Sequence, residues 1–159
     1  MKTPAPTLLK WAYCLVLLYA VRRLGLAGSS WVALARGEIG DSLPLIGVLP
    51  MLTLAVYRIY LVARVPGTLS SYPATGFAGV LRRLGVFGLY VGATGSIASL
   101  AAGPLMRALM TSHTESGAEY FVVGMYLSML VGVGKFGLLC YELSRLIAFE
   151  QDTSARNPS

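Results

Sequence analysis

The chain has 159 residues, of which 55% are hydrophobic and 13% are charged, and its formal net charge is +6. A soluble domain carries about 25% charged residues because its surface faces water, so we expect much of this surface to face lipid. The basic residues cluster beside apolar runs, as charges do where they anchor spans at a membrane face, which argues against a nucleic-acid partner.

The first candidate span covers residues 8–28. Its uncharged centre, Trp11 to Val21, is short for a bilayer that needs about 20 apolar residues. Lys10 on one side and Arg22 and Arg23 on the other can direct their charged groups to the interface and so complete the span. A secretory signal peptide is the rival interpretation, but two arginines between an apolar core and a cleavage site are unfavourable for one.

The second candidate span covers residues 43–65. Pro44 suits the first turn of a helix, where its missing N–H costs nothing. Pro50 lies further in, where it removes a backbone hydrogen bond, so we expect a kink there. Membrane helices tolerate such a kink when neighbouring groups satisfy the freed carbonyl.

The third candidate span, residues 84–106, contains no charged residue. It is entered through Arg82 and Arg83, and it is left through Gly103 and Pro104. These residues and Arg107, which follows the span, mark where the chain is expected to enter and leave the membrane.

The fourth candidate span covers residues 120–146, and Lys135 is its only charged residue before Glu142. Arg145 is the nearest partner for Glu142, because residues three apart on a helix are neighbours. The polar residues 151–159 are expected to form a disordered cytoplasmic tail.

These segments predict an all-α, polytopic membrane protein, with four transmembrane helices in a bundle that occupies residues 1–150. Four spans put both termini and the second loop on one side of the membrane. The positive-inside rule makes that side cytoplasmic, because it holds seven basic residues against four. The seven are Lys2, Lys10, Arg64, Arg82, Arg83, Arg145 and Arg156, and the four are Arg22, Arg23, Arg36 and Arg107.

Small residues recur along one face of the third span at spacings of three and four, and the fourth span has a series spaced by four. In lipid, close backbone approach along such faces drives helix association, so we predict that these two spans pack as an antiparallel hairpin. Two points stay open: glycine is common in membrane helices, and the packing partner could belong to another subunit. The predicted packing residues are Gly85, Gly88, Gly92, Gly95, Ser99 and Ala102 in the third span, and Gly124, Ser128 and Gly132 in the fourth.

Lys135 is a possible intramembrane polar site, with three interpretations. Its ammonium group reaches the interface if the span ends near Tyr141, since six residues of helix rise about 9 Å. Otherwise it contacts a polar group inside the bundle, or it binds an anionic ligand or lipid head group. Arg58 is the second possible polar site, and its flanking tyrosines favour an interfacial position. An alternative combines Arg58 and Lys135 with Arg82 and Arg83 into a basic collar for anionic lipid.

Motifs for chemistry are absent from the sequence. The one histidine, His113, lies in a predicted outer loop, no cluster has zinc-ligand spacing, and no carboxylate lies in the middle of a predicted span. There is no glycine-rich phosphate loop or nucleophile motif. We therefore expect no catalytic, cofactor-binding or metal-binding residues, and no enzyme activity. Cys14 and Cys140 form no CxxC pair and are expected to be buried apolar residues.

Two segments resemble a family of small bacterial four-span inner-membrane proteins of unknown function. They are VYRIYLVARV (Val56 to Val65) with the following VLRRLGVFGL (Val80 to Leu89), and the stretch from Tyr120 to Glu150. The resemblance covers roughly the last two-thirds of the chain and implies a multi-pass protein of the bacterial inner membrane. The chain departs from the family where a longer acidic C-terminal helix is cut short after Asp152.

The sequence favours a non-enzymatic accessory or interaction subunit that assembles through its glycine faces into a homo- or hetero-oligomer. The alternative function is a small transporter or channel component with Lys135 near the pathway. The expected partners are the lipid bilayer and, at the cytoplasmic face, anionic lipid.

Overall fold

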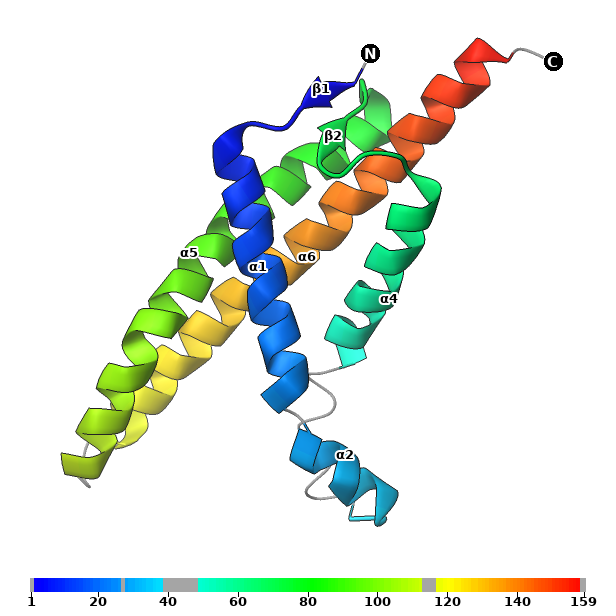
Figure 1. Cartoon of the computed structure of the whole chain (residues 1–159). Coiled ribbons are helices and arrows are strands. Elements are labelled where there is room, and N and C mark those ends of the chain that lie inside the picture. Colours follow the sequence, from blue (N-terminus) through cyan, green and yellow to red (C-terminus); the bar gives the residue numbers. More distant parts are fainter. Residues whose placement is uncertain (1, 27, 39–48, 113–116, 158–159) are drawn as a thin grey trace.

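The computed structural model describes residues 2–26, 28–38, 49–112 and 117–157, and this part of the chain is predominantly helical (Figure 1). The helical character that the apolar runs predict is therefore confirmed. The helices are α1 (Thr7–Leu26), α2 (Gly28–Ala35), α4 (Leu49–Arg64), α5 (Gly76–Ser112) and α6 (Gly117–Arg156), and two short strands are β1 (Thr3–Pro4) and β2 (Ser70–Ser71).

The two longest described helices, α5 and α6, lie side by side as an antiparallel hairpin (Figure 1). Each contains a stretch that is long and apolar enough to cross a membrane, Gly76–Pro104 in α5 and Val122–Arg156 in α6. The hairpin predicted for the third and fourth spans is therefore present within this chain. α1 packs against both of its helices, and α4 packs against α1 and α6.

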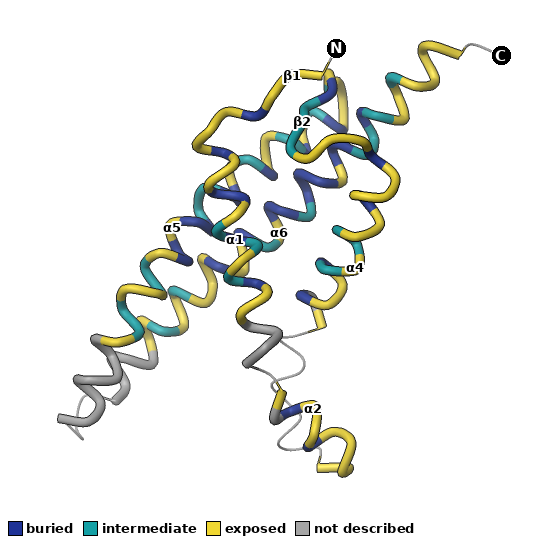
Figure 2. The backbone as a smooth tube through the Cα atoms, in the orientation of Figure 1, coloured by how far each residue is buried: buried dark blue, intermediate teal, exposed yellow. Residues whose placement is uncertain are grey.

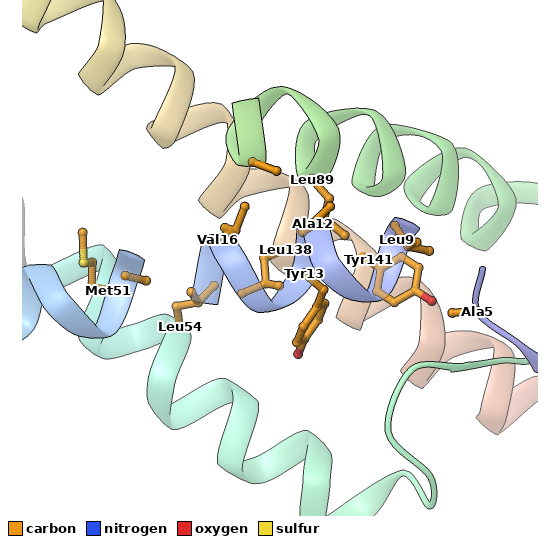
Figure 3. Packing of buried hydrophobic residues seen from close by; sticks show 12 residues of the cluster. Ala5, Leu9, Ala12, Tyr13, Val16, Met51, Leu54, Leu89, Leu138 and Tyr141 are labelled. Atoms are coloured by element: carbon orange, nitrogen blue, oxygen red, sulfur yellow. The ribbon is translucent and has the colours of Figure 1, made fainter. Parts of the chain in front are cut away.

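One hydrophobic core joins α1, α4, α5 and α6 (Figure 3). It lies in the half of the hairpin nearer the two termini, and the other described half of α6 is mostly exposed (Figure 2). α1 and α4 thus cover only part of the hairpin. The core includes Leu9, Tyr13 and Val16 of α1, Met51 and Leu54 of α4, Leu89 of α5, and Leu138 and Tyr141 of α6.

The N-terminal segment is tied to the connection between α4 and α5, a contact that the sequence did not predict. β1 and β2 pair antiparallel, with Thr3 opposite Ser71 and Pro4 opposite Ser70. The backbone N–H of Ala5 donates to the carbonyl of Leu69 over 3.2 Å. The start of the chain, this connection and the end of α6 consequently lie at the same end of the molecule (Figure 1).

Both long helices run past their predicted ends. α5 begins at Gly76 and continues through Pro104 to Ser112, so the helix is longer at both ends than the predicted span of residues 84–106. α6 continues to Arg156, so residues 151–156 are helical and not a disordered tail. An ion pair between Arg156 and Asp152, four residues apart and 3.1 Å long, supports this last stretch of helix.

Near the start of the molecule, one further feature differs from the predicted spans. α1 begins and ends close to the predicted first span, but a second helix, α2, lies between the first and second predicted spans. Pro50 is the second described residue of α4, so the turn before it, on which the expected kink depends, lies outside the described residues. Pro44 and the predicted start of the second span lie outside them.

Candidate functional site

A buried carboxylate, that of Glu142 on α6, joins three helices. The Glu142 side chain is 2% exposed, and its Oε1 accepts a hydrogen bond from the Tyr13 hydroxyl of α1. The same oxygen lies 3.1 Å from Nη1 of Arg58 on α4, and Oε2 lies 3.0 Å from Nη1 of Arg145 on α6. We call these four residues the Glu142 network.

Arg145 extends the network to a fourth part of the chain. Its side chain is 1% exposed, and its Nη2 donates to the backbone carbonyl of Gly67 in the connection between α4 and α5. Gly67 has a φ of +82°, a conformation that side chains other than glycine rarely adopt. The turn that presents this carbonyl therefore depends on glycine at position 67.

Aromatic rings surround the charges. The guanidinium carbon of Arg58 lies 5.2 Å from the centre of the Tyr13 ring, a distance typical of a cation–π contact. The Tyr13 ring meets the Tyr141 ring edge to face, with 6.4 Å between the two centres. The Tyr141 hydroxyl in turn lies 3.4 Å from Oγ of Ser71 in β2. The network is thus packed between aromatic side chains and away from water.

Electrostatics make this arrangement specific. The Glu142 network contains two guanidinium groups and one carboxylate, and each ion loses its hydration when the helices pack. Such a cluster adds little net stability compared with apolar packing, but breaking it leaves an uncompensated buried charge. The network therefore favours one relative placement of α1, α4 and α6 over others.

Charged residues of several helices meet at one level of the molecule. A methyl group built on Gly85 would lie 2.6 Å from the backbone nitrogen of Tyr141, so these two positions are directly apposed. Arg82 precedes Gly85 on α5, and Glu142 follows Tyr141 on α6, which puts both on the terminus-facing side of this contact. We call this level the polar layer, and the Glu142 network forms its buried part.

Below the polar layer, α5 contacts α6 through glycines. Methyl groups built on Gly88 and Gly95 would lie 2.6 Å from Gly137 Cα and Leu130 Cβ, and one on Gly92 would overlap Gly134. These distances are far too short for a side chain, so the two backbones touch. Val16 of α1 covers this crossing, since its Cγ2 would lie 3.2 Å from a methyl group at Gly92.

The prediction that Gly124, Ser128 and Gly132 of α6 contact α5 was wrong. Among the described residues, a methyl group on Gly124 or Gly132 would meet no atom within 4 Å, and Ser128 is exposed. The helix uses Gly134 and Gly137 instead. Gly132 and Gly134 are two residues apart, so they point about 200° away from each other around the helix. On α5, Ser99 is only partly buried, whereas Ser96 is buried and donates to the Gly92 carbonyl over 2.7 Å.

The structure separates the two predicted polar sites. Arg58 points inward, and its side chain is 14% exposed and pairs with Glu142; its flanking tyrosines did not reveal this partner 84 residues away. Lys135 is partly buried on α6, about 9 Å from Tyr141 along the helix. The predicted pairing of Glu142 with Arg145 is confirmed at 3.0 Å.

The sequence predicted neither the hydrogen bond of Tyr13 nor the burial of Glu142, because Glu142 was expected near the end of a span. The one feature of the sequence that could have indicated this burial is that Glu142 is an acidic residue within a helical pattern of apolar residues. Cys140 is buried as expected, but Cys14 is exposed on α1. Within the described residues, no group of three or more His, Cys, Asp or Glu side chains could hold a metal ion.

Comparison with family models, with curated proteins and with solved structures found no match to this chain.

Replacing Tyr13 by phenylalanine is expected to lower the free energy of unfolding by about 1.5–3 kcal/mol, because it removes a buried hydrogen bond to a carboxylate. Thermal unfolding in mild detergent, followed by circular dichroism, measures the effect. Tyr126→Phe is the matched control, since Tyr126 is 60% exposed. Equal melting temperatures for the two variants would contradict a role for Tyr13 in the network.

Proposed function

We propose that this chain is an integral membrane protein, with α1, α4, α5 and α6 as its spans, that serves as a non-enzymatic accessory or interaction subunit. Large apolar side chains on the outside of all four helices support the membrane placement. A soluble monomer rarely exposes so much contiguous apolar surface. Examples are Leu8 and Trp11 on α1, Val56 and Ile59 on α4, Phe77 and Phe87 on α5, and Met129 and Phe136 on α6, each more than 60% exposed.

The polar layer supports an orientation in that membrane. It separates the uncharged stretch of α5, and a stretch of α6 in which Lys135 is the only charged residue, from a charged end that also holds both termini. Basic residues dominate this end, and an excess of Lys and Arg marks the cytoplasmic side. We therefore place the polar layer at the cytoplasmic head-group level, with both termini in the cytoplasm. The resemblance of Val56 to Val65, Val80 to Leu89 and Tyr120 to Glu150 to a family of bacterial proteins supports our proposal of the bacterial inner membrane.

The interaction function rests on one observation: α6 carries a small-residue face that α5 does not use. Methyl groups on Gly124 and Gly132 would meet nothing within 4 Å, and Ser128 between them is exposed. In lipid, such a face permits the close approach of another helix, which provides packing and weak hydrogen bonds. We propose that it takes a helix of a partner subunit, either a second copy or a different protein.

Gly132→Leu tests this proposal, because it fills the unused face at an exposed position where an added Cβ meets no described atom within 4 Å. The variant is expected to remain in the membrane fraction and keep its melting temperature, but to lose the oligomer or partner that co-purifies with the wild type in mild detergent. Val133→Leu is the control, since Val133 is 38% exposed and lies about 100° around the helix from Gly132. Co-purification that survives Gly132→Leu would contradict the interaction proposal. Absence of the wild-type chain from membranes would contradict the membrane placement.

The partial burial of Lys135 keeps a small transporter or channel component as the second candidate. This alternative requires flux through proteoliposomes that contain the purified chain, and Lys135→Leu should abolish that flux. Under the interaction proposal, Lys135→Leu leaves assembly with the partner intact. The two functions therefore give opposite results for the same substitution.

A further inference from the structure

Arg82 is a cation in the polar layer whose donors are not satisfied within the described chain. Its Nε and Nη2 are buried, and neither has a hydrogen-bond partner. Buried polar groups in folded proteins almost always have partners, so each exception calls for an explanation. An unpaired guanidinium is a costly exception, because burial removes water that would otherwise hydrate the charge.

The excess of positive charge in the polar layer also indicates that Arg82 lacks a partner. Arg82 precedes Gly85 by three residues, about 4.5 Å along α5, and Gly85 abuts Tyr141. Arg82 therefore lies level with the stretch of α6 that carries Glu142 and Arg145. At this level the described, partly or fully buried groups are three guanidiniums, those of Arg58, Arg82 and Arg145, against the single carboxylate of Glu142. Glu142 is already shared between Arg58 and Arg145, so Arg82 lacks a counter-charge.

We propose that Arg82 binds the phosphate of an anionic phospholipid head group. Guanidinium donors match phosphate oxygens in geometry and charge. The Arg82 side chain as a whole is only partly buried, so a phosphate can approach it from its exposed side. The depth selects lipid over free phosphate, since Arg82 lies two residues before the uncharged stretch that begins at Leu84. The inference rests on the membrane placement proposed above, because only that placement brings head groups to this level.

Arg83 is a matched control that the chain itself provides. It carries the same charge at the next position of α5, but it is exposed and points about 100° away around the helix. A diffuse attraction between basic residues and anionic lipid would treat Arg82 and Arg83 alike. A specific binding site would lose lipid affinity when Arg82 is replaced but not when Arg83 is replaced.

The test measures the melting temperature of the purified full chain in mild detergent while phosphatidylglycerol, phosphatidylcholine or inorganic phosphate is added. Phosphatidylglycerol is expected to raise the melting temperature of the wild type and of Arg83→Gln, and phosphatidylcholine is expected to have no effect. In Arg82→Gln the apparent affinity for phosphatidylglycerol should fall about tenfold. Without lipid, Arg82→Gln should melt no lower than the wild type, since it removes a charge that lacks a partner.

Three results would overturn the proposal. Equal losses for Arg82→Gln and Arg83→Gln would show diffuse attraction, and a shift produced fully by inorganic phosphate would show that the ligand is not lipid. A lower melting temperature of Arg82→Gln without lipid would show that the guanidinium has a partner within the chain. If Arg82→Gln does not fold, Arg82→Lys decides, because it keeps the charge but loses the paired donors; undiminished lipid affinity would then contradict the site. Failure of the membrane placement is separate, since it appears as absence from the membrane fraction.

Discussion

Replacing Gly92 by leucine is expected to separate α5 from α6 and abolish the folded hairpin. Even the first carbon of a side chain at this position would overlap the backbone of Gly134. Both positions are glycine, so no flexible side chain can move aside, and the helices themselves must shift. Gly92→Ala alone should cost about 1–3 kcal/mol, as overpacking of a well-packed core does. The measurement is thermal unfolding in mild detergent, followed by circular dichroism.

Gly132→Leu is the control for this experiment, because Gly132 is exposed and a Cβ added there meets no atom of the described residues within 4 Å. Leucine has a higher helix propensity than glycine, so each substitution by itself favours the helical state. A lower melting temperature of Gly92→Leu than of Gly132→Leu must therefore come from the contact between α5 and α6. Similar melting temperatures would show that this contact is not as close as the structure places it.

Glu142→Gln is expected to lower the free energy of unfolding by about 3–5 kcal/mol, because it leaves two buried guanidiniums without a counter-charge. Glutamine keeps the size of the side chain, so the change isolates the charge. Glu150→Gln is the control: Glu150 pairs with Arg64 at 2.6 Å, but both side chains are 51% exposed. Exposed pairs contribute about 0–1 kcal/mol. Thermal unfolding of the two variants in the same detergent compares them.

A compensating variant distinguishes charge from packing. Replacing Arg58 and Arg145 by methionine together with Glu142→Leu removes all three ions of the network and retains side-chain volume. Its stability should recover toward that of the wild type, because buried ion clusters are replaceable by apolar groups when every charge leaves together. If Glu142→Gln melts like Glu150→Gln, the carboxylate is hydrated and the network is not desolvated as described.

Local patterns were sufficient for much of the fold. Apolar runs predicted the helices, since length and composition along the chain are local properties. The spacing of Gly85, Gly88, Gly92 and Gly95 indicated one face of α5, because a helix puts residues three and four apart on the same side. Helix ends were less accurate: Pro104 and Glu150 looked like boundaries, yet α5 and α6 continue past them.

Contacts between segments distant in the sequence could not be predicted from such local patterns. α6 has two small-residue faces, one with Gly124, Ser128 and Gly132 and the other with Gly134 and Gly137. Their spacings are equally suited to close packing, so the sequence could not select between them. The choice depends on the side chains around each face, and in the structure Leu130 and Tyr141 accompany the second face against α5.

The sequence by itself determined a helical, lipid-compatible chain with a glycine face on α5 and basic residues at one end. Only the tertiary structure decided that Arg58 turns inward and that Glu142 is buried. A long side chain can reach either an interface or a partner, and the partner of Arg58 lies 84 residues away in the sequence. Such a pairing has no local pattern, because it exists only when α1, α4 and α6 pack together and exclude water from the charges.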